Sequence, residues 1–124
     1  MEQKFLRCSH CGNIVAMVKD KGVPVMCCGQ KMEVMIPGTV EASKEKHIPE
    51  YSVIDGKVTV VVGAIEHPMV SEHYIEWISL QTKKGNQRKQ LSPEDKPTVH
   101  FLIDADDEVE AVYAYCNLHG LWKK

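Results

Sequence analysis

A chain of 124 residues has room for one domain, or for one domain with a small appendage. Its hydrophobic share of 44% and charged share of 26% are ordinary for a globular protein. The net charge of −2 provides no overall basic field that would recruit nucleic acid or an anionic membrane.

The first residues, MEQKFLRCSH, lack the apolar core of a secretory signal. The longest apolar run, residues 58–65, is too short to cross a bilayer. We therefore expect a cytoplasmic protein with neither a membrane nor a nucleic-acid partner.

Two cysteine knuckles, CSHCGN and MCCGQKM, lie in the first 32 residues. In a chain expected in the cytoplasm, such cysteines indicate a metal site rather than disulfides. Two residues separate Cys8 from Cys11, so both sulfurs can reach one ion, and Gly12 relaxes the backbone around it. Cys27 and Cys28 are adjacent, which requires a sharp turn and predicts a distorted tetrahedron. A piece below roughly 40 residues needs such a cross-link to fold. The spacing leaves iron and zinc both open.

The composition changes near residue 37, where a longer region rich in short strand-forming runs begins. Turn signals such as DG and KKGN separate some of these runs. No segment shows convincing helical periodicity. The spacing favours an antiparallel β-sandwich, with immunoglobulin-like topology as the more specific hypothesis. We predict strands over residues 51–54, 57–63, 73–82, 98–104 and 108–116.

Six histidines are spread along the chain. His10 lies inside the first knuckle, where we expect a solvated neighbour of the metal site. His100 alternates with apolar residues in TVHFLID and is expected to be a packed or hydrogen-bonded strand residue. The other four lie at strand ends or in loops, where ligands are usually presented: His47, His67, His73 and His119.

The stretch AYCNLHGLW contains Cys116 and His119 with two residues between them. Singly, each of the four loop histidines reads as an ordinary surface residue. With Cys116 they offer four nitrogens and one sulfur, more ligands than zinc usually takes, and they would leave a sixth position open. We expect the amides of Asn117 and Leu118 to donate to the Cys116 sulfur.

Three aromatic residues lie near these motifs: Tyr74, Trp77 and Trp122. They could shield a metal–sulfur bond from water, but we favour plain packing in the sandwich core.

At this point the chain resembles the desulfoferrodoxins, the two-iron form of superoxide reductase. The matching pieces are CSHCG, CCGQKM, EKHIPEY, HPMVSEHYIEWI and CNLHGLWK, and the resemblance covers essentially the whole chain. It implies a mainly β homodimer. A desulforedoxin-like, rubredoxin-like four-cysteine iron domain would span residues 1–37. A superoxide reductase catalytic domain, an immunoglobulin-like antiparallel β-sandwich, would span residues 38–124.

The resemblance also implies two iron centres in each chain. The first would be a distorted tetrahedron of four thiolates: Cys8, Cys11, Cys27 and Cys28. The second would have an axial Cys116 and four equatorial histidines: His47, His67, His73 and His119. The implied reaction is one-electron reduction of superoxide to hydrogen peroxide without oxygen release, with electrons from a rubredoxin-type protein.

The polar run SKEKH precedes this second set of ligands. By itself it reads as a solvated charged loop. Beside His47, Lys46 is the best candidate for a cation that guides superoxide inward and organises a water near the product. Glu45 resembles the family's mobile glutamate, which can take the sixth position after peroxide leaves.

Two other functions stay open from the residues. One is an electron-transfer protein with two iron centres and no substrate, for which an open sixth position and Lys46 would have no use. The other is a zinc-stabilised binding module, for which the two knuckles are enough. That function leaves the four histidines and Cys116 unexplained.

Overall fold

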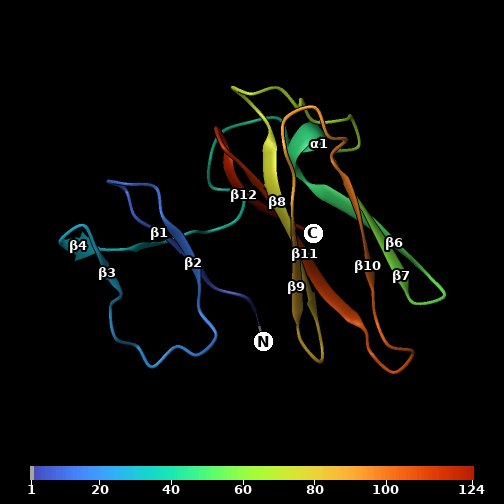
Figure 1. Cartoon of the computed structure of the whole chain (residues 1–124), viewed down its shortest axis with the longest axis horizontal. Coiled ribbons are helices and arrows are strands. Elements are labelled where there is room, and N and C mark those ends of the chain that lie inside the picture. The colour runs from blue at the N-terminus through green and yellow to red at the C-terminus, as the bar shows by residue number, and fades with distance from the viewer. Residues whose placement is uncertain (1) are drawn as a thin grey trace. The chain divides into compact units, whose positions relative to one another are not determined.

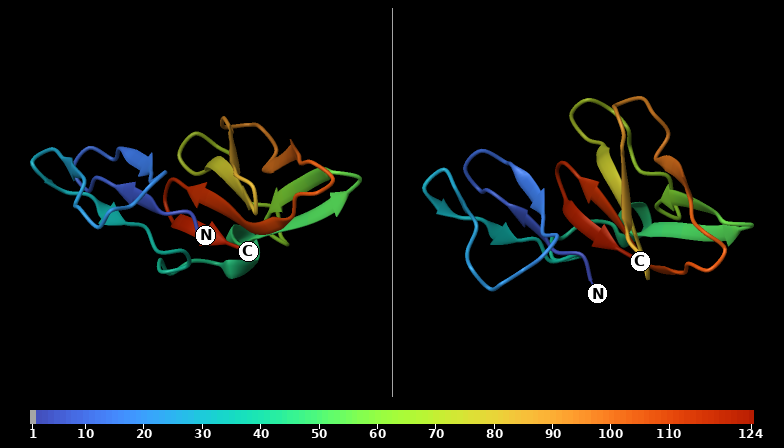
Figure 2. Two further views of the ribbon diagram at one scale, coloured as in Figure 1. Left: turned by 90° about the horizontal axis from the view of Figure 1, so that it is seen from below. Right: turned by 60° about the horizontal axis from the view of Figure 1, so that its bottom comes forward.

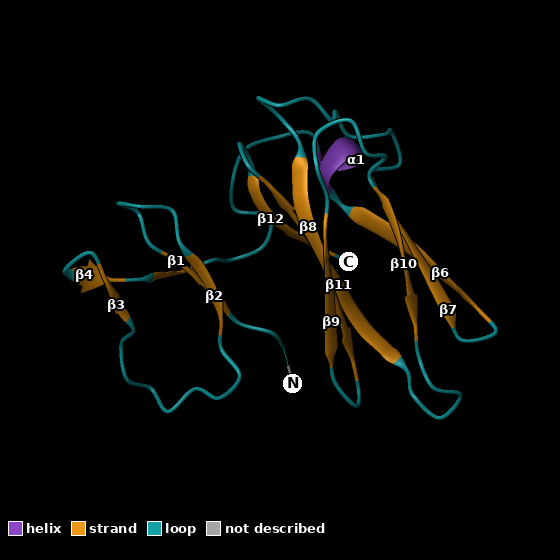
Figure 3. Cartoon of the chain, viewed as in Figure 1, coloured by secondary structure: helices purple, strands orange, loops and turns teal. Residues whose placement is uncertain are grey.

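The computed structural model describes residues 2–124, which divide into two compact units, Met1–Ile36 and Pro37–Lys124. We call them the N-terminal unit and the C-terminal unit. Helix in the described residues is confined to the four residues of α1 (Lys44–His47), and the rest is strand, turn and loop (Figure 3). The prediction of a mainly β chain is therefore confirmed. No helix in this range has the length and apolar character needed to cross a membrane.

The N-terminal unit is built from very short strands around the four cysteines. They are β1 (Phe5–Arg7), β2 (Ile14–Ala16), β3 (Met26–Cys27), β4 (Gln30–Lys31) and β5 (Glu33–Val34). Antiparallel pairing gives a three-stranded sheet in the order β2-β1-β5 and a separate β3-β4 hairpin. Its buried hydrophobic cluster is small and consists of Leu6, Cys8 and Met32, and Phe5 is buried as well. So little buried apolar surface makes the unit dependent on a cross-link.

The C-terminal unit consists of two antiparallel sheets. Its strands are β6 (Pro49–Ile54), β7 (Lys57–Val62), β8 (Ile75–Thr82), β9 (Asn86–Gln90), β10 (Thr98–Leu102), β11 (Val109–Cys116) and β12 (Gly120–Lys123). One sheet has the order β10-β7-β6 and the other the order β12-β11-β8-β9 (Figure 1). Within this unit, the green strands β6 and β7 and the red strands β11 and β12 form separate layers (Figure 2).

The core of the C-terminal unit lies between the two sheets. Alternate residues of β7 are fully buried, as the two-residue period of a strand requires: Val58, Val60 and Val62. Alternate residues of β11 belong to the same core: Val112, Ala114 and Cys116. The predicted antiparallel β-sandwich is confirmed, and its last core position on β11 is a candidate metal ligand.

The five short strands of the N-terminal unit were not predicted, and in the C-terminal unit two strands and one helix were not predicted either. Strand β9 has the sequence NQRKQ and is exposed along its whole length, so no hydrophobic alternation marks it. It forms as the hairpin partner of β8. Strand β12 returns directly after the turn that follows Cys116, and α1 is only one helical turn long. The strand predicted from residue 73 begins at Ile75, because His73 belongs to a loop.

Candidate metal centres

The four cysteines of the two knuckles form one cluster, which we call the four-cysteine cluster. Its members offer sulfur atoms that all lie within 4.8 Å of one another: Cys8, Cys11, Cys27 and Cys28. The Cys11 and Cys27 sulfurs are 3.6 Å apart, and those of Cys27 and Cys28 are 4.0 Å apart. A tetrahedron with metal–sulfur bonds of about 2.3 Å has edges of about 3.8 Å. The spacing therefore fits one tetrahedral ion.

Left-handed backbone lets the adjacent cysteines share this site. Cys28 has φ 53° and Gly29 has φ 73°, so the chain reverses immediately after Cys27. This is the sharp turn that the adjacent pair predicted. In the other knuckle, Gly12 has φ 83° and its amide donates to the Cys8 carbonyl over 2.9 Å.

The ionisation of these thiols also fits a cation. A hydrogen bond from the Cys11 backbone amide lowers the pKa of Cys8 to about 6. The Cys11 thiol, together with burial, raises the pKa of Cys28 to about 12. Thiols this close cannot all ionise on their own, because each thiolate opposes the next. A bound metal cation removes that opposition, and thiolate sulfur suits iron as well as zinc.

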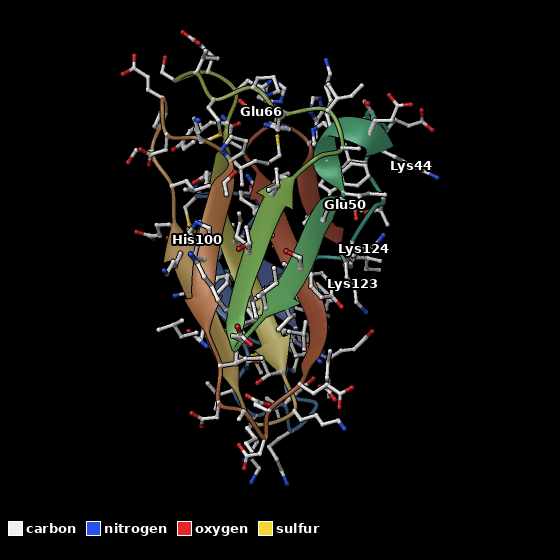
Figure 4. The ribbon with its side chains drawn as sticks, turned by 90° about the vertical axis from the view of Figure 1, so that its right-hand side faces the viewer. Lys44, Glu50, Glu66, His100, Lys123 and Lys124 are labelled. Carbon is white, nitrogen blue, oxygen red and sulfur yellow. The ribbon has the colours of Figure 1, made fainter. Side chains whose placement is uncertain are left out.

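A second group of candidate ligands, which we call the histidine–cysteine cluster, lies at one end of the C-terminal unit. His47 ends α1, and His67 and His73 lie in the loop between β7 and β8. Cys116 ends β11, and His119 lies in the turn before β12. One atom from each of the first three histidines lies within 4.8 Å of the others and of the Cys116 sulfur. Lys44 and Glu66 mark this end of the unit in Figure 4.

The four imidazole rings form a closed square. Neighbouring rings meet nearly at right angles, with interplanar angles of 80°, 82°, 80° and 84° in the order His47–His67–His73–His119–His47. The neighbouring ring centres are 4.6–5.0 Å apart. His47 and His73 lie across the square, 6.2 Å apart and inclined by 27°. Cys116 places its sulfur 3.9 Å from His119 Nδ1.

Several ring nitrogens inside the square carry no proton, and their lone pairs face one another. His47 Nδ1 donates to the Ser43 carbonyl over 2.6 Å, and His67 Nδ1 donates to the Pro68 carbonyl over 2.7 Å. Carbonyls only accept, so the proton of each neutral ring is on Nδ1 and its Nε2 is bare. These two Nε2 atoms are nevertheless only 3.1 Å apart.

Protonation does not remove the repulsion between these two unprotonated nitrogens. Burial lowers the pKa of His47, and it lowers the pKa of His67 to about 4, so both rings are neutral near pH 7. His47 Nε2 is also 3.1 Å from His119 Nδ1, and the buried His73 Nε2 has no hydrogen-bond partner. Metal–nitrogen bonds of about 2.1 Å would place neighbouring nitrogens about 3.0 Å apart. These donor atoms therefore fit a cation at their centre.

The Cys116 sulfur belongs to this site and is fully buried. Burial raises the pKa of the thiol, while the backbone amides of Leu118 and His119 favour the thiolate. The sequence predicted this role for the amides of Asn117 and Leu118. That prediction is wrong for Asn117, whose amide donates to the Tyr74 carbonyl over 3.2 Å.

The three aromatic residues near the motifs have different environments. Trp122 is buried, its ring centre lies 5.0 Å from that of His47, and its Nε1 donates to the His119 carbonyl over 3.0 Å. Trp122 is therefore part of the packed core and also lines the histidine–cysteine cluster. Trp77 is buried and stacks on Tyr115 at 5.4 Å, and Tyr74 is half-buried.

Lys46 and Glu45 are exposed on α1, directly before His47. Burial lowers the pKa of His73, and the charges of His119 and Lys46 lower it further. The Lys46 charge also contributes to the low pKa of His47. Lys46 directly precedes His47 on α1, so its positive charge belongs to the same end of the unit as the histidine–cysteine cluster.

The loop that follows β7 holds α1 in place. Gly63 donates to the Ile48 carbonyl over 3.2 Å, and Ile65 donates to the Glu45 carbonyl over 3.1 Å. Gly63 has φ 89°, and a Cβ atom there would lie 2.7 Å from the Lys46 carbonyl oxygen. The close approach of these two backbones fixes where Lys46 and His47 sit. Nothing in the sequence pattern predicted this contact.

The remaining histidines lie outside both clusters. His10 is exposed. His100 lies along β10, away from the α1 end, and its Nδ1 is 3.0 Å from the Thr59 hydroxyl on the neighbouring strand β7 (Figure 4). Both agree with the expectations from the sequence.

Comparison with known proteins gives consistent matches. The sequence model of the desulfoferrodoxin family matches residues 39–124. The desulfoferrodoxin of Nitratidesulfovibrio vulgaris is 41% identical over 122 residues, which cover 98% of this chain and 95% of that protein. The crystal structure of the superoxide reductase from Treponema pallidum superposes with a TM-score of 0.85 at 40% identity, covering 100% of this chain and 99% of the other. The one-iron superoxide reductase of Giardia intestinalis gives a TM-score of 0.55 at 34% identity and covers 65% of this chain and 96% of its own.

Proposed function

This chain belongs to the desulfoferrodoxin family, and from that membership we propose how its residues carry out the reduction of superoxide to hydrogen peroxide. The chain is a superoxide reductase with two iron sites. The observation that carries this conclusion is the square of imidazole nitrogens above a buried thiol, whose bare lone pairs converge on one point. Five ligand atoms would leave an iron ion held there with room for a substrate.

The histidine–cysteine cluster is the catalytic site. Iron held by these residues would supply the electron, so that each superoxide would take up one electron and two protons to become hydrogen peroxide. The neutral histidines leave the positive charge of the site largely uncompensated, which favours an anionic substrate. The Cys116 thiolate supplies electron density from its buried position, and Trp122 excludes water from the His47 side.

The charged residues of α1 serve the substrate and the product. Lys46 attracts the superoxide anion and holds a water near the product, which its electrostatic effect on His47 and His73 supports. Glu45 would provide a carboxylate that can bind the iron once the product has left. Its place on the same helical turn as Lys46 and His47 supports this role.

The broader assignments follow from the family resemblance. The four-cysteine cluster belongs to an iron domain of residues 1–37, and residues 38–124 form the catalytic domain. The enzyme is a cytoplasmic homodimer that takes electrons from a rubredoxin-type protein. The competing function, an electron carrier with no substrate, would use neither Lys46 nor the sixth position.

The test is the reaction of the reduced, iron-analysed protein with superoxide, with peroxide and oxygen measured together. A reductase gives one peroxide for each superoxide consumed and evolves no oxygen. A dismutase would evolve oxygen, and an electron carrier would show no rapid reaction. Cys116→Ser is the matched control, because it removes the sulfur ligand and should abolish both the reaction and the visible thiolate absorption of that site.

A further inference from the structure

Asn117 lies between two ligands, Cys116 and His119, yet it contacts a third part of the site. We propose that Asn117 is a positioning residue that fastens the loop carrying His73 to the turn carrying the other two ligands. The proposal rests on the function assigned to the histidine–cysteine cluster, and it concerns how the site keeps its shape.

Three hydrogen bonds join Asn117 to the residues on either side of His73. The side-chain oxygen Oδ1 accepts from the Tyr74 amide over 3.0 Å, and Nδ2 donates to the Glu72 carbonyl over 3.0 Å. The Asn117 backbone amide donates to the Tyr74 carbonyl over 3.2 Å. The backbone is thus held immediately before and immediately after the ligand.

His73 depends on this attachment more than His47 and His67 do. The rings of His47 and His67 are each oriented by a hydrogen bond from Nδ1 to a backbone carbonyl. Among residues 2–124, no such bond is found for the His73 ring, and its Nε2 has no partner either. Its own backbone bonds run only to Val70, within the same loop.

The orientation of the His73 ring therefore follows from the backbone on which it stands. An asparagine suits this place, since one side chain can accept from an amide and donate to a carbonyl at the same time. Residues that orient a ligand are known to change metal affinity by roughly 10–100-fold when they are removed. Asn117 acts on His73 through the two neighbouring peptide groups.

The test compares Asn117→Ala with the full-length parent. We expect the variant to bind iron in the histidine–cysteine cluster roughly 10–100-fold more weakly in a chelator competition. We also expect its visible thiolate-to-iron absorption to shift, because His73 no longer holds its place opposite His47. Iron in the four-cysteine cluster should be retained, and Mössbauer spectra of the iron-loaded chain distinguish the two sites.

Two further variants make the test specific. Gln87→Ala removes a similar amide bond, from Nε2 to the Leu102 carbonyl at 2.8 Å, far along the chain from any ligand, and should behave as the parent. Asn117→Asp keeps the acceptor for the Tyr74 amide but loses the donor to Glu72, so it should give an intermediate affinity. This variant also decides the question if Asn117→Ala does not fold.

Parental affinity and an unshifted absorption in both Asn117 variants would overturn the proposal, as would equal weakening in Gln87→Ala. These readouts do not use superoxide. An unreactive parent with weakened Asn117 variants would therefore count against the proposed function while supporting the role of Asn117.

Discussion

Lys46 is the residue at which charge is expected to control the rate of substrate capture. It is exposed, it precedes a ligand, and its charge acts on two rings of the site. We expect Lys46→Ala to slow the second-order reaction with superoxide by roughly tenfold, because local steering of an anion is lost. The rate should also become less sensitive to salt. Pulse radiolysis at two ionic strengths measures both effects.

Lys57→Ala is the matched control for this prediction. Lys57 is also exposed, but it begins β7, the strand whose other end leads to the site. Its removal changes the net charge by the same amount and should leave the rate nearly unchanged. An equal slowing in both variants would assign the effect to net charge and remove Lys46 from the capture step.

At the scale of single residues, the metal ligands could be predicted from the sequence. The residues that hold those ligands in position by hydrogen bonds could not. Cysteine spacing and the placement of histidines at strand ends point to metal chemistry, because few other uses require those residues together. Asn117 could not be found in this way, since its partners are 43 and 45 residues distant along the chain. Such a hydrogen bond has no local pattern.

The contact between α1 and the loop after β7 is the element-scale feature most sensitive to mutation. A Cβ atom on Gly63 would lie 2.3 Å from the Ile65 carbonyl oxygen and 2.8 Å from the Lys46 Cα, at a φ of 89°. We expect Gly63→Ala to lower the free energy of unfolding by about 1–3 kcal/mol, because backbone must move to make room. Urea denaturation of the iron-loaded protein measures this change.

Gly85→Ala provides the comparison in the same unit. A Cβ atom on Gly85, in the β8–β9 turn, would have nothing within 4 Å. We expect little change in its stability. If Gly63→Ala were as stable as Gly85→Ala, the close approach of α1 and the loop would not restrain the site.

Most of the predicted strands in the C-terminal unit have buried positions that must be apolar, although β6 was predicted from its strand-forming residues while exposed from Glu50 to Ile54. In β7 the buried positions alternate and are all valine, whereas β11 is buried continuously from Ala111 to Cys116 and shows as an apolar run. Strand β9 is polar throughout and exists because β8 offers it hydrogen bonds. Helix α1 has no hydrophobic period because its single turn buries only His47. Tertiary contacts, rather than local preference, create both elements.

At the scale of the whole molecule, the two units should differ in their dependence on metal. The N-terminal unit has few buried apolar side chains, whereas the C-terminal unit has a continuous core between two sheets. We expect removal of both irons under reducing conditions to unfold the N-terminal unit and to leave the sandwich folded. Hydrogen exchange measured by mass spectrometry would show fast exchange in β1, β2 and β5 and continued protection in β7, β8 and β11.

Restoring iron should return protection to the N-terminal unit. Slow exchange in β1 of the metal-free chain would contradict the prediction, because it would show that the small core is sufficient. Fast exchange in β7 would contradict the expectation that the sandwich stays folded, because it would show that the C-terminal unit needs iron in the histidine–cysteine cluster.

Two of the four rings at the catalytic site, those of His47 and His67, are oriented by hydrogen bonds to the Ser43 and Pro68 carbonyls, so their orientation does not depend on a bound ion. Imidazole donors do not by themselves make a site selective for iron. Divalent copper and zinc generally bind such donors more tightly than ferrous iron does. We therefore expect the metal content of the site to follow the metals supplied during expression. The same polypeptide produced in a zinc-rich, iron-poor medium would share this fold yet be colourless and inert toward superoxide. Iron nutrition of the producing cell is in this sense a determinant of specific activity.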